Sequence, residues 1–462
     1  MPTNNRPKVV IVGAGFGGLT AARRIARMAV QVTVVDRKNH HTFQPLLYQV
    51  ATAGLSPGEI AAPIRNILRG YPNIEVLLEE VVDFKLEQKK VVTKEQVLDY
   101  NFLIIASGAT HAYFGHQEWE PLAPGLKTIE DALEIRRRVL LAFELAERQN
   151  KTANSQSGSP LQFVVVGGGP TGVELAGTLA EIARHAMNHE FRNIDPKQAR
   201  ILLIEGGNRV LAAYSEKLSR KAEDQLRRLG VEVRTSHMVN RIEPGVVWVG
   251  DERIPAAVVL WAAGVAASPL GGKLGAPVDR AGRVLVQPDL SVPGHPEVFV
   301  IGDLAALKDE SGKMLPGVAQ VAIQEGEWVA ETVARDLENQ PRRNFRYHDK
   351  GSLATIGRAA AVAQFPKFAL SGYFAWLAWL FIHILFLIGF RNRLLVMIQW
   401  AWSYLTYERG ARLITGSDEL PGWAGQAQDG GKTDASPVQQ AEDARLSTSK
   451  FESTAATAVD KV

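Results

Sequence analysis

The 462-residue sequence contains no cysteine. A chain without thiols forms no disulfide and no thiolate metal site, and it cannot carry electrons through cysteine sulfur. Its ten histidines are scattered, with no zinc-type cluster, and its formal net charge of +3 gives no indication of a nucleic-acid partner. A signal peptide is also missing, because MPTNNRP leads directly into an apolar run, so we expect a cytoplasmic protein body.

What the sequence does contain begins with residues 8–36, which read KVVIVGAGFGGLTAARRIARMAVQVTVVD. An apolar run ends in glycines, a helical pattern follows, and a second apolar run closes on an acid. Gly13 permits a tight turn, Gly15 lets backbone approach a pyrophosphate, and Gly18 lets helix and strand pack closely. Asp36, 18 residues after Gly18, is placed to bind an adenosine ribose. The complete succession favours a dinucleotide site over an ordinary glycine-rich turn.

The rest of the first domain is less regular. Residues 37–49 are rich in polar and ring side chains, which fits a loop around the first cofactor or a solvated surface loop. Residues 101–110 predict a buried strand that ends in small residues, and Gly108 there would let backbone reach the cofactor. Residues 128–150 predict a charged amphipathic helix. The polar stretch 151–160 that follows predicts a linker between domains.

The opening motif then returns. An apolar run from residue 161 leads into Gly167, Gly169 and Gly172, and a helix follows. The second apolar run ends on Glu205, 33 residues after Gly172, whereas about 20 is usual for this fingerprint. Residues 187–200 look like an insertion that accounts for the excess.

An acid at position 205 favours NADH over NADPH, because it binds ribose hydroxyls and would repel a 2′-phosphate. Arg209 nearby has the opposite tendency, but NADH remains our expectation. A buried strand within residues 251–264 ends on Ala262-Ala263-Gly264, which makes Gly264 a further candidate for cofactor binding. Two dinucleotide folds in one chain predict two dinucleotides, one held tightly and one exchanging, as in a flavin oxidoreductase.

Two further features lie after the second motif. The strand predicted at residues 298–303 ends on Asp303, which we expect to bind the flavin ribityl chain, the alternative being a helix N-cap. The helix predicted at residues 316–337 carries Gln320 and Gln324 on one face. Amides suit the carbonyls of a quinone or flavin. From spacing alone, however, a partly buried polar face is the favoured interpretation.

Together these motifs resemble the type II NADH:quinone oxidoreductases, which are single-subunit NADH dehydrogenases that do not pump protons. The resemblance covers about residues 8–415, and the glutamine pair matches the family's quinone-site motif. Ser107 stands where the family usually has threonine, and it can serve equally well. The segments that carry the likeness, besides the two fingerprints, are FQPLLYQVATAG (43–54), GGGPTGVELAG (167–177), WAAGV (261–265), IGD (301–303) and AQVAIQ (319–324).

The resemblance implies two Rossmann-type domains of the glutathione-reductase-like kind and a C-terminal helical module that anchors the protein to a membrane. It also implies that Glu174 lies near the nicotinamide and the flavin, although an acid there would also stabilise the start of its helix. The implied FAD ligands, for a non-covalent cofactor, are Gly13, Gly15, Gly18, Asp36 and Asp303. The implied NADH ligands are Gly167, Gly169, Gly172 and Glu205, and the implied quinone ligands are Gln320 and Gln324.

The predicted domain boundaries follow from these motifs. They are residues 1–125 with 284–345 for FAD, 126–283 for NADH, 346–415 for the membrane module and 416–462 for a disordered tail.

Residues 368–390 form an uncharged apolar stretch near the C-terminus. As one helix it would be about 34 Å long, enough to span a bilayer core of about 30 Å. Basic residues flank both ends, and the aromatic stretch 394–407 is too short to return across. We therefore expect two helices lying in one leaflet, with Arg391 and Arg393 at the headgroups. A single span and a buried core helix are the alternatives.

The sequence thus predicts a flavoprotein on the cytoplasmic face of the cell membrane that passes electrons from NADH through FAD to ubiquinone or menaquinone. Membrane lipid is an expected partner and a homodimer is possible. One alternative is a soluble reductase of a small iron–sulfur protein, which would have no use for the apolar stretch. Another is an NADH-sensing flavoprotein with little turnover. A sulfide:quinone reductase is excluded because it needs cysteines.

Overall fold

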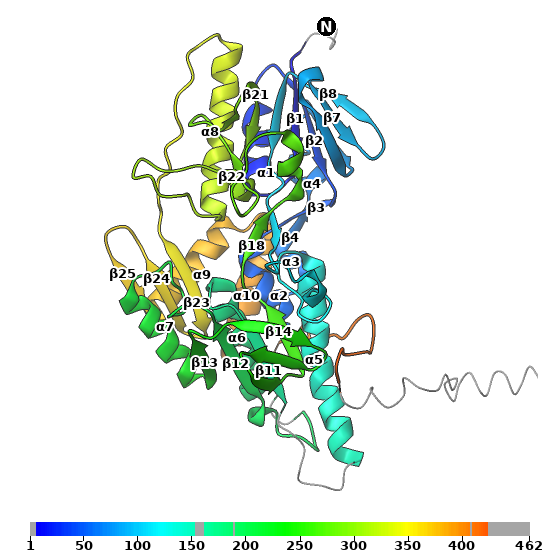
Figure 1. The fold of residues 1–462 in the computed structure, drawn as a ribbon, viewed down its shortest axis with the longest axis vertical. Coiled ribbons are helices and arrows are strands. Elements are labelled where there is room, and N and C mark those ends of the chain that lie inside the picture. The colour runs from blue at the N-terminus through cyan, green and yellow to red at the C-terminus, as the bar shows by residue number, and fades with distance from the viewer. Residues whose placement is uncertain (1–5, 153–160, 188–189, 407–408, 424–462) are drawn as a thin grey trace, which may run out of the picture. The chain divides into compact units, whose positions relative to one another are not determined.

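The computed structural model describes residues 6–152, 161–187, 190–406 and 409–423 (Figure 1). The described residues up to Leu420 form one compact unit, and a second unit begins at Pro421. Most of the predicted linker at 151–160 and most of the predicted tail lie outside the described residues.

The first sheet is built around the N-terminal fingerprint. Its strands pair in parallel, except for the antiparallel pair at one edge, β20 and β21. Because β21 pairs with β9, residues near position 300 complete a sheet that begins at residue 8. The strands are, in order across the sheet, β20 (Ser291–Val292), β21 (His295–Val300), β9 (Phe102–Ile105), β1 (Lys8–Val12), β2 (Gln31–Asp36) and β5 (Ile74–Leu78).

Two helices pack closely together beside this sheet, α1 (Phe16–Ile25) and α8 (Ala319–Leu337) (Figure 1). Their backbones approach at Gly17 and Gly326. A Cβ on Gly326 would lie 2.4 Å from the Gly17 carbonyl oxygen, so glycine is required there. This contact ties the helix that carries both glutamines to the helix that follows the first glycine motif.

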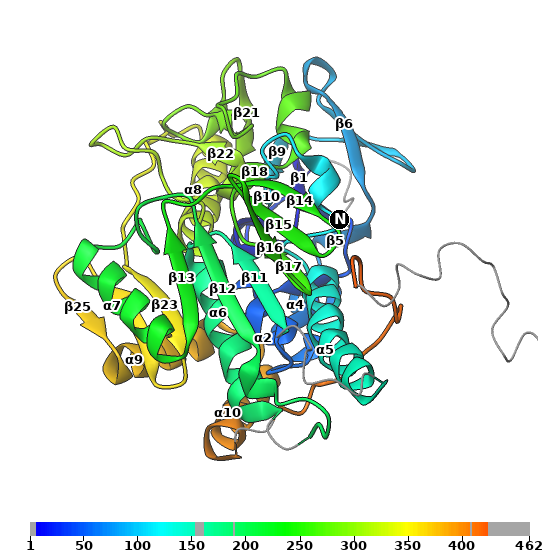
Figure 2. The same ribbon diagram turned by 60° about the horizontal axis from the view of Figure 1, so that its bottom comes forward.

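The second sheet repeats the first, and all its strand pairs are parallel. Figure 2 shows it with its helices and with a small antiparallel sheet nearby. The strands are, in order, β13 (Val231–Thr235), β12 (Arg200–Glu205), β11 (Gln162–Val166) and β17 (Val258–Trp261). The helices are α5 (Ile129–Thr152), α6 (Pro170–Glu181) and α7 (Glu216–Arg228), and the small sheet contains β14 (Val239–Glu243), β15 (Val246–Val249) and β16 (Glu252–Pro255). The fold class predicted from the two fingerprints is confirmed.

Short elements complete the two domains. The strands are β3 (His40–Thr42) with β4 (Ala61–Pro63), β6 (Val81–Lys85) with β7 (Lys90–Thr93) and β8 (Val97–Asp99), and β19 (Val284–Leu285) with β22 (Ala305–Ala306). The antiparallel pair β10 (Ala109–His111) and β18 (Val265–Ala267) joins the segments that leave the two sheets. The short helices are α2 (Leu47–Ala51), α3 (Pro57–Ile60) and α4 (Ile64–Leu68).

The C-terminal module is an antiparallel sheet followed by two helices. It packs on the second domain where β23 crosses α6. A Cβ on Gly177 of α6 would lie 1.7 Å from the Ile356 carbonyl oxygen, so only glycine allows this approach. The elements are β23 (Ser352–Gly357), β24 (Ala360–Gln364), β25 (Ala369–Ser371), α9 (Tyr373–Phe386) and α10 (Phe390–Thr406).

The prediction of one apolar helix over residues 368–390 is wrong. Its first residues instead form β25, which pairs with β24, and α9 has 14 residues. Gly372 and Gly389 adopt left-handed conformations, with φ of 73° and 88°, and Leu387 is extended. Within the described ranges, no helix has the length and apolar character needed to cross a membrane.

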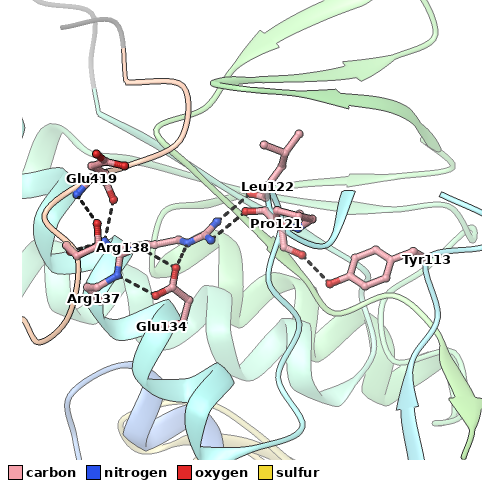
Figure 3. Close-up of polar contacts among 9 residues, drawn as sticks. Tyr113, Pro121, Leu122, Glu134, Arg137, Arg138 and Glu419 are labelled. Atoms are coloured by element: carbon pink, nitrogen blue, oxygen red, sulfur yellow. Dashed lines mark hydrogen bonds and ion pairs between the residues drawn. The ribbon is translucent and has the colours of Figure 1, made fainter. Parts of the chain in front are cut away.

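The predicted start of the disordered tail at residue 416 is also wrong. Leu420 is 1% exposed. Arg137 on α5 donates from Nη1 to the carbonyl oxygens of Ser417, at 2.7 Å, and Glu419, at 2.8 Å. Glu134 accepts from the same arginine, as Figure 3 shows. The chain is therefore held along α5 up to residue 420, and residues 424–462 lie outside the described part.

Candidate functional site

One cavity of about 2160 Å³ connects the two glycine motifs, the start of α8 and one side of α9. A pocket for one small ligand usually has about 300–1,000 Å³. The cavity is therefore large enough for more than one ligand. Because its wall includes both fingerprints, two dinucleotides could meet inside it.

The first fingerprint has the geometry that a pyrophosphate needs. Gly13 has φ of 97°, and a Cβ there would lie 2.5 Å from the Ala106 carbonyl oxygen. A Cβ on Gly18 would lie 1.8 Å from the Gly13 carbonyl oxygen, so helix and strand can meet only through glycine. Gly15 lines the cavity, and a Cβ there would meet nothing within 4 Å. Its backbone is thus open to an anion at the helix N-terminus.

The second fingerprint repeats these positions. Gly167 has φ of 107°, and a Cβ on Gly172 would lie 1.8 Å from the Gly167 carbonyl oxygen. Gly169 lines the cavity and, like its counterpart in the first motif, has open space where a Cβ would be. The same backbone therefore occurs twice in one chain, and each copy faces the shared cavity.

Asp36 is fixed by backbone amides at the end of β2. Its carboxylate accepts from the N–H of Ala14 at 2.7 Å and of Lys38 at 2.8 Å. Burial raises the pKa of Asp36, and these two bonds oppose that effect. The carboxylate lines the cavity with lone pairs to spare, as a ribose ligand requires.

Glu205 occupies the equivalent position at the end of β12. It accepts from the N–H of Gly168 at 2.5 Å and of Gly207 at 2.6 Å. Arg209, whose charge could have favoured a 2′-phosphate, donates instead to the Ala212 carbonyl oxygen at 3.0 Å. The local arrangement thus leaves an acid on the cavity wall beside the second glycine motif, and an acid at this position favours NADH over NADPH.

Several polar groups are left available on the FAD side of the cavity. Ser107 Oγ and His41 Nε2 are buried and have no hydrogen-bond partner among the described residues. His41 Nδ1 lies 2.9 Å from the Ala14 carbonyl oxygen, and burial lowers the pKa of this histidine. Gly108, with φ of 67°, leaves open space beside them. These unsatisfied groups and open backbone fit a bound FAD.

Asp303 is predicted to bind the ribityl chain, with a helix N-cap as the alternative. It lies in a short 3₁₀ turn, Gly302–Leu304, directly after β21, and it lines the cavity. The residue at the N-cap position is Ile301, and no side-chain cap bond is found in this described segment. The geometry is therefore compatible with a ligand role. Gly264 also lines the cavity, with φ of 82°.

Glu174 is on α6 and lines the cavity. Burial raises its pKa to about 8, although a hydrogen bond from the Thr355 backbone of β23 lowers it. An acid that only stabilised the helix N-terminus would be solvated and ionised. Glu174 instead keeps a proton close to neutral pH, and it contacts the C-terminal module directly.

Gln320 and Gln324 differ in their surroundings. Gln320 lines the cavity, donates from Nε2 to the Gly351 carbonyl oxygen at 2.9 Å, and leaves Oε1 buried without a partner in the described chain. Gln324 exchanges two hydrogen bonds of 3.0 Å with the backbone of His348, and it is not among the described residues that line the cavity. The structure therefore brings Gln320 into the site and leaves Gln324 at its margin.

Helix α9 contributes to this site, which the sequence did not predict. Ile382, His383 and Phe386 line the cavity. His383 stacks on Trp379 with ring centroids 4.1 Å apart, and its Nδ1 lies 2.7 Å from the Trp379 carbonyl oxygen. Burial lowers the pKa of His383 to about 4. A lone histidine in an uncharged stretch was the available signal.

Comparison with known protein families defines the class of this protein. Residues 7–326 match the pyridine nucleotide-disulphide oxidoreductase family, and residues 349–407 match the NDH2 C-terminal domain. A redox-active disulfide is excluded here because the sequence has no cysteine. The chain belongs to the type II NADH:quinone oxidoreductases.

Curated relatives cover nearly the whole chain. The type II NADH:quinone oxidoreductase NdhA of Mycobacterium tuberculosis is 45% identical over 429 residues, which are 89% of this chain and 90% of the relative. The Ndh enzyme of the same organism is 43% identical over 426 residues, with the same shares. These identities are high enough to establish family membership.

Solved structures agree on the fold. NDH2 from Plasmodium falciparum in complex with NADH has a TM-score of 0.79 at 23% identity and covers 89% of this chain and 100% of that one. The sulfide:quinone oxidoreductase of Aquifex aeolicus has a TM-score of 0.66 at 18% identity, with 84% and 92% covered.

Proposed function

We propose that this protein oxidises NADH and reduces a membrane quinone by two electrons without pumping protons. The observation that carries the proposal is the single cavity lined by both glycine motifs, Glu174, Gln320 and α9. Bound FAD would supply the two-electron carrier between the nicotinamide and the quinone. Because the chain lacks cysteine, no thiol can serve as an intermediate carrier.

Each of the two glycine motifs would bind a different dinucleotide. Gly13, Gly15, Gly18, Asp36, Gly108 and Asp303 would hold FAD, and Gly167, Gly169, Gly172, Glu205 and Gly264 would hold NADH. The Glu205 carboxylate, fixed by two backbone amides, selects NADH by binding ribose hydroxyls and repelling a 2′-phosphate.

Gln320 is our candidate for the acceptor end of the site. Its Nε2 is bonded to a backbone carbonyl, so the amide oxygen faces away from that bond and can accept a hydrogen bond from the hydroquinone product. Gln324 remains a candidate through the family motif, although both of its amide groups already bond to His348.

Protons must accompany the electrons, because a quinone takes up two electrons and two protons to become a hydroquinone. Hydride from NADH carries two electrons and one proton, and the second proton must be delivered by the protein or the solvent. Glu174 can hold such a proton, since burial raises its pKa to about 8. We assign it to proton relay.

Attachment to the cytoplasmic face of the membrane would use α9 and α10. Phe390 is 82% exposed and Leu405 is 77% exposed, and Arg391 beside Phe390 is exposed as well. An apolar surface flanked by cations suits one leaflet with its anionic headgroups. Other large apolar side chains exposed on these two helices are Phe374, Leu377, Phe381, Leu385, Phe386, Leu394, Met397, Ile398 and Trp402.

The decisive test measures NADH oxidation by the vesicle-bound enzyme with and without a short-chain quinone, for wild type, Gln320→Ala and Gln324→Ala. We expect Gln320→Ala to keep flavin reduction by NADH and to lose most quinone-dependent turnover. Gln324→Ala should have the smaller effect. If the wild-type enzyme ignored quinone and reduced an iron–sulfur protein instead, the proposed acceptor would be wrong.

A further inference from the structure

Tyr48 lines the cavity, but the proposed function assigns no role to its hydroxyl group. It lies on α2, within the FQPLLYQVATAG segment, and is only 4% exposed. Its side chain lines the cavity, and its ring lies edge-on to Trp379 of α9 with centroids 6.5 Å apart. It therefore stands between the first domain and the C-terminal module.

A directed chain of hydrogen bonds ends on the Tyr48 oxygen. Trp400 of α10 donates from its indole N–H to Gln49 Oε1 at 2.7 Å, and Gln49 Nε2 donates to the Tyr48 hydroxyl at 2.8 Å. An indole nitrogen can only donate, which fixes the orientation of the Gln49 amide. The Tyr48 oxygen is thus an acceptor from Gln49, and its own hydrogen must point elsewhere.

That hydrogen has no acceptor among the residues the structure describes. The charged groups that act on Tyr48 are Glu174 and Glu181 of α6 and Arg409 after α10, and burial together with the two acids raises its pKa. Glu181 is already ion-paired with Arg409 at 3.0 Å. Glu174 lines the same cavity as Tyr48, and its helix α6 packs against α2, so Glu174 is the acid left to exchange a proton with Tyr48.

Three other polar groups of the cavity wall near α6, α8 and α9 are weaker candidates for the donor. Gln320 presents an unpartnered amide oxygen, which can only accept. His383 holds the hydrogen of its Nδ1 on the Trp379 carbonyl oxygen, so its neutral ring offers a lone pair at Nε2. Tyr214 also lines the cavity near Glu174 and is the alternative donor, but no ordered chain orients its hydroxyl within the described residues.

We propose that the Tyr48 hydroxyl is the proton donor to the quinone oxygen during its reduction, and that Glu174 returns the proton to Tyr48. The Tyr48 O–H bond breaks as the quinone O–H bond forms, the phenolate takes the Glu174 carboxyl proton, and the Glu174 carboxylate takes up one proton from the solvent. NADH, one proton and the quinone thus give NAD⁺ and hydroquinone. This step rests on the proposed function.

The test uses the full-length enzyme with FAD bound, on vesicles, and follows each half-reaction separately by stopped flow. In Tyr48→Phe we expect flavin reduction by NADH to stay within about twofold of wild type. Reoxidation by a short-chain quinone should slow by about tenfold or more, as the loss of a general acid does. A small buffer acid such as imidazolium should then accelerate reoxidation in the variant and leave wild type unchanged.

Two further variants keep the test decisive. Trp400→Phe releases the Gln49 amide, which can then turn and capture the Tyr48 hydrogen, so reoxidation should slow while FAD content is kept. Tyr214→Phe removes the rival hydroxyl and should retain the wild-type reoxidation rate.

The proposal is overturned if Tyr48→Phe reoxidises at the wild-type rate or cannot be rescued by acid, or if Tyr214→Phe is the slow variant. Should Tyr48→Phe fail to bind FAD, an unchanged Trp400→Phe overturns it. Failure of wild type to reduce quinone would refute the proposed function instead.

Discussion

The Arg409 guanidinium lies 3.0 Å from the Glu181 carboxylate, and both side chains are largely buried. Arg409 also donates to the Thr52 carbonyl oxygen at 2.9 Å, and the Arg358 backbone N–H donates to Glu181. One ion pair therefore connects the segment after α10 with α6 of the second domain and with the end of α2 in the first. It holds the C-terminal module against the wall that carries Glu174.

Breaking this pair should destabilise the fold. Arg409→Met leaves the Glu181 carboxylate buried without its cation, and we expect a loss of about 3–5 kcal/mol in the free energy of unfolding. The matched control is Arg220→Met, which breaks an exposed pair with Glu216 and should cost less than about 1 kcal/mol. Urea denaturation of both variants gives the comparison. Equal losses would show that the buried pair contributes nothing special.

Glu325 predicts a pH-dependent contribution to stability. It is 1% exposed, its carboxyl accepts from the Gly302 N–H at 2.5 Å, and burial raises its pKa to about 8. The folded state therefore binds a proton that the unfolded state releases near pH 4.5. This contribution to stability is complete below about pH 4.5 and is lost as the pH rises towards about 8.

Glu325→Gln should keep the bond to Gly302 and remove that pH dependence. Glu325→Ala leaves the Gly302 N–H unsatisfied next to Asp303, which costs about 1–3 kcal/mol at any pH and should weaken FAD retention. Thermal unfolding between pH 5 and pH 8, together with release of FAD into the filtrate, measures both effects. An unchanged pH slope in Glu325→Gln would contradict the assignment.

The sequence predicts those parts of the site whose residues lie close together along the chain. The two glycine motifs and the acids at positions 36 and 205 lie in short segments, so the fold class could be predicted from them. The same segments identify the candidate nucleotide sites. Gln320 and Gln324 look equivalent on a helix, and only tertiary contacts with Gly351 and His348 separate them.

Contacts between residues far apart in the sequence could not be predicted in this way. The bond between Gln49 and Trp400 joins residues 351 positions apart, and no spacing rule predicts it. The apolar stretch at 368–390 failed for a related reason. Hydropathy alone does not reveal that residues 369–371 pair with β24. The part of the cavity wall that α9 contributes depends on this helix starting after β25, at Tyr373.

Glu174→Gln tests the proton relay without changing the shape of the side chain. We expect flavin reduction by NADH to stay close to the wild-type rate and quinone-dependent reoxidation to slow. Because burial raises the Glu174 pKa to about 8, wild-type reoxidation should fall as the pH rises through that value, and the variant should lose this dependence. Stopped-flow measurements from pH 6 to pH 9 decide it. If both half-reactions matched wild type, Glu174 would have no role in proton transfer.

The exposed apolar surface of α9 and α10 predicts where the protein meets the bilayer. Phe390→Asp combined with Leu405→Asp places two carboxylates where exposed side chains would enter the lipid. Each buried apolar side chain contributes about 1.5–3 kcal/mol, so vesicle binding should weaken by tenfold or more. Turnover with a water-soluble quinone should persist, because neither residue lines the cavity in the described chain. Val97→Asp, at a 51% exposed site on β8, is the control and should bind vesicles as wild type does. Sedimentation with anionic vesicles measures the difference, and equal binding of the two variants would place the membrane surface on another face.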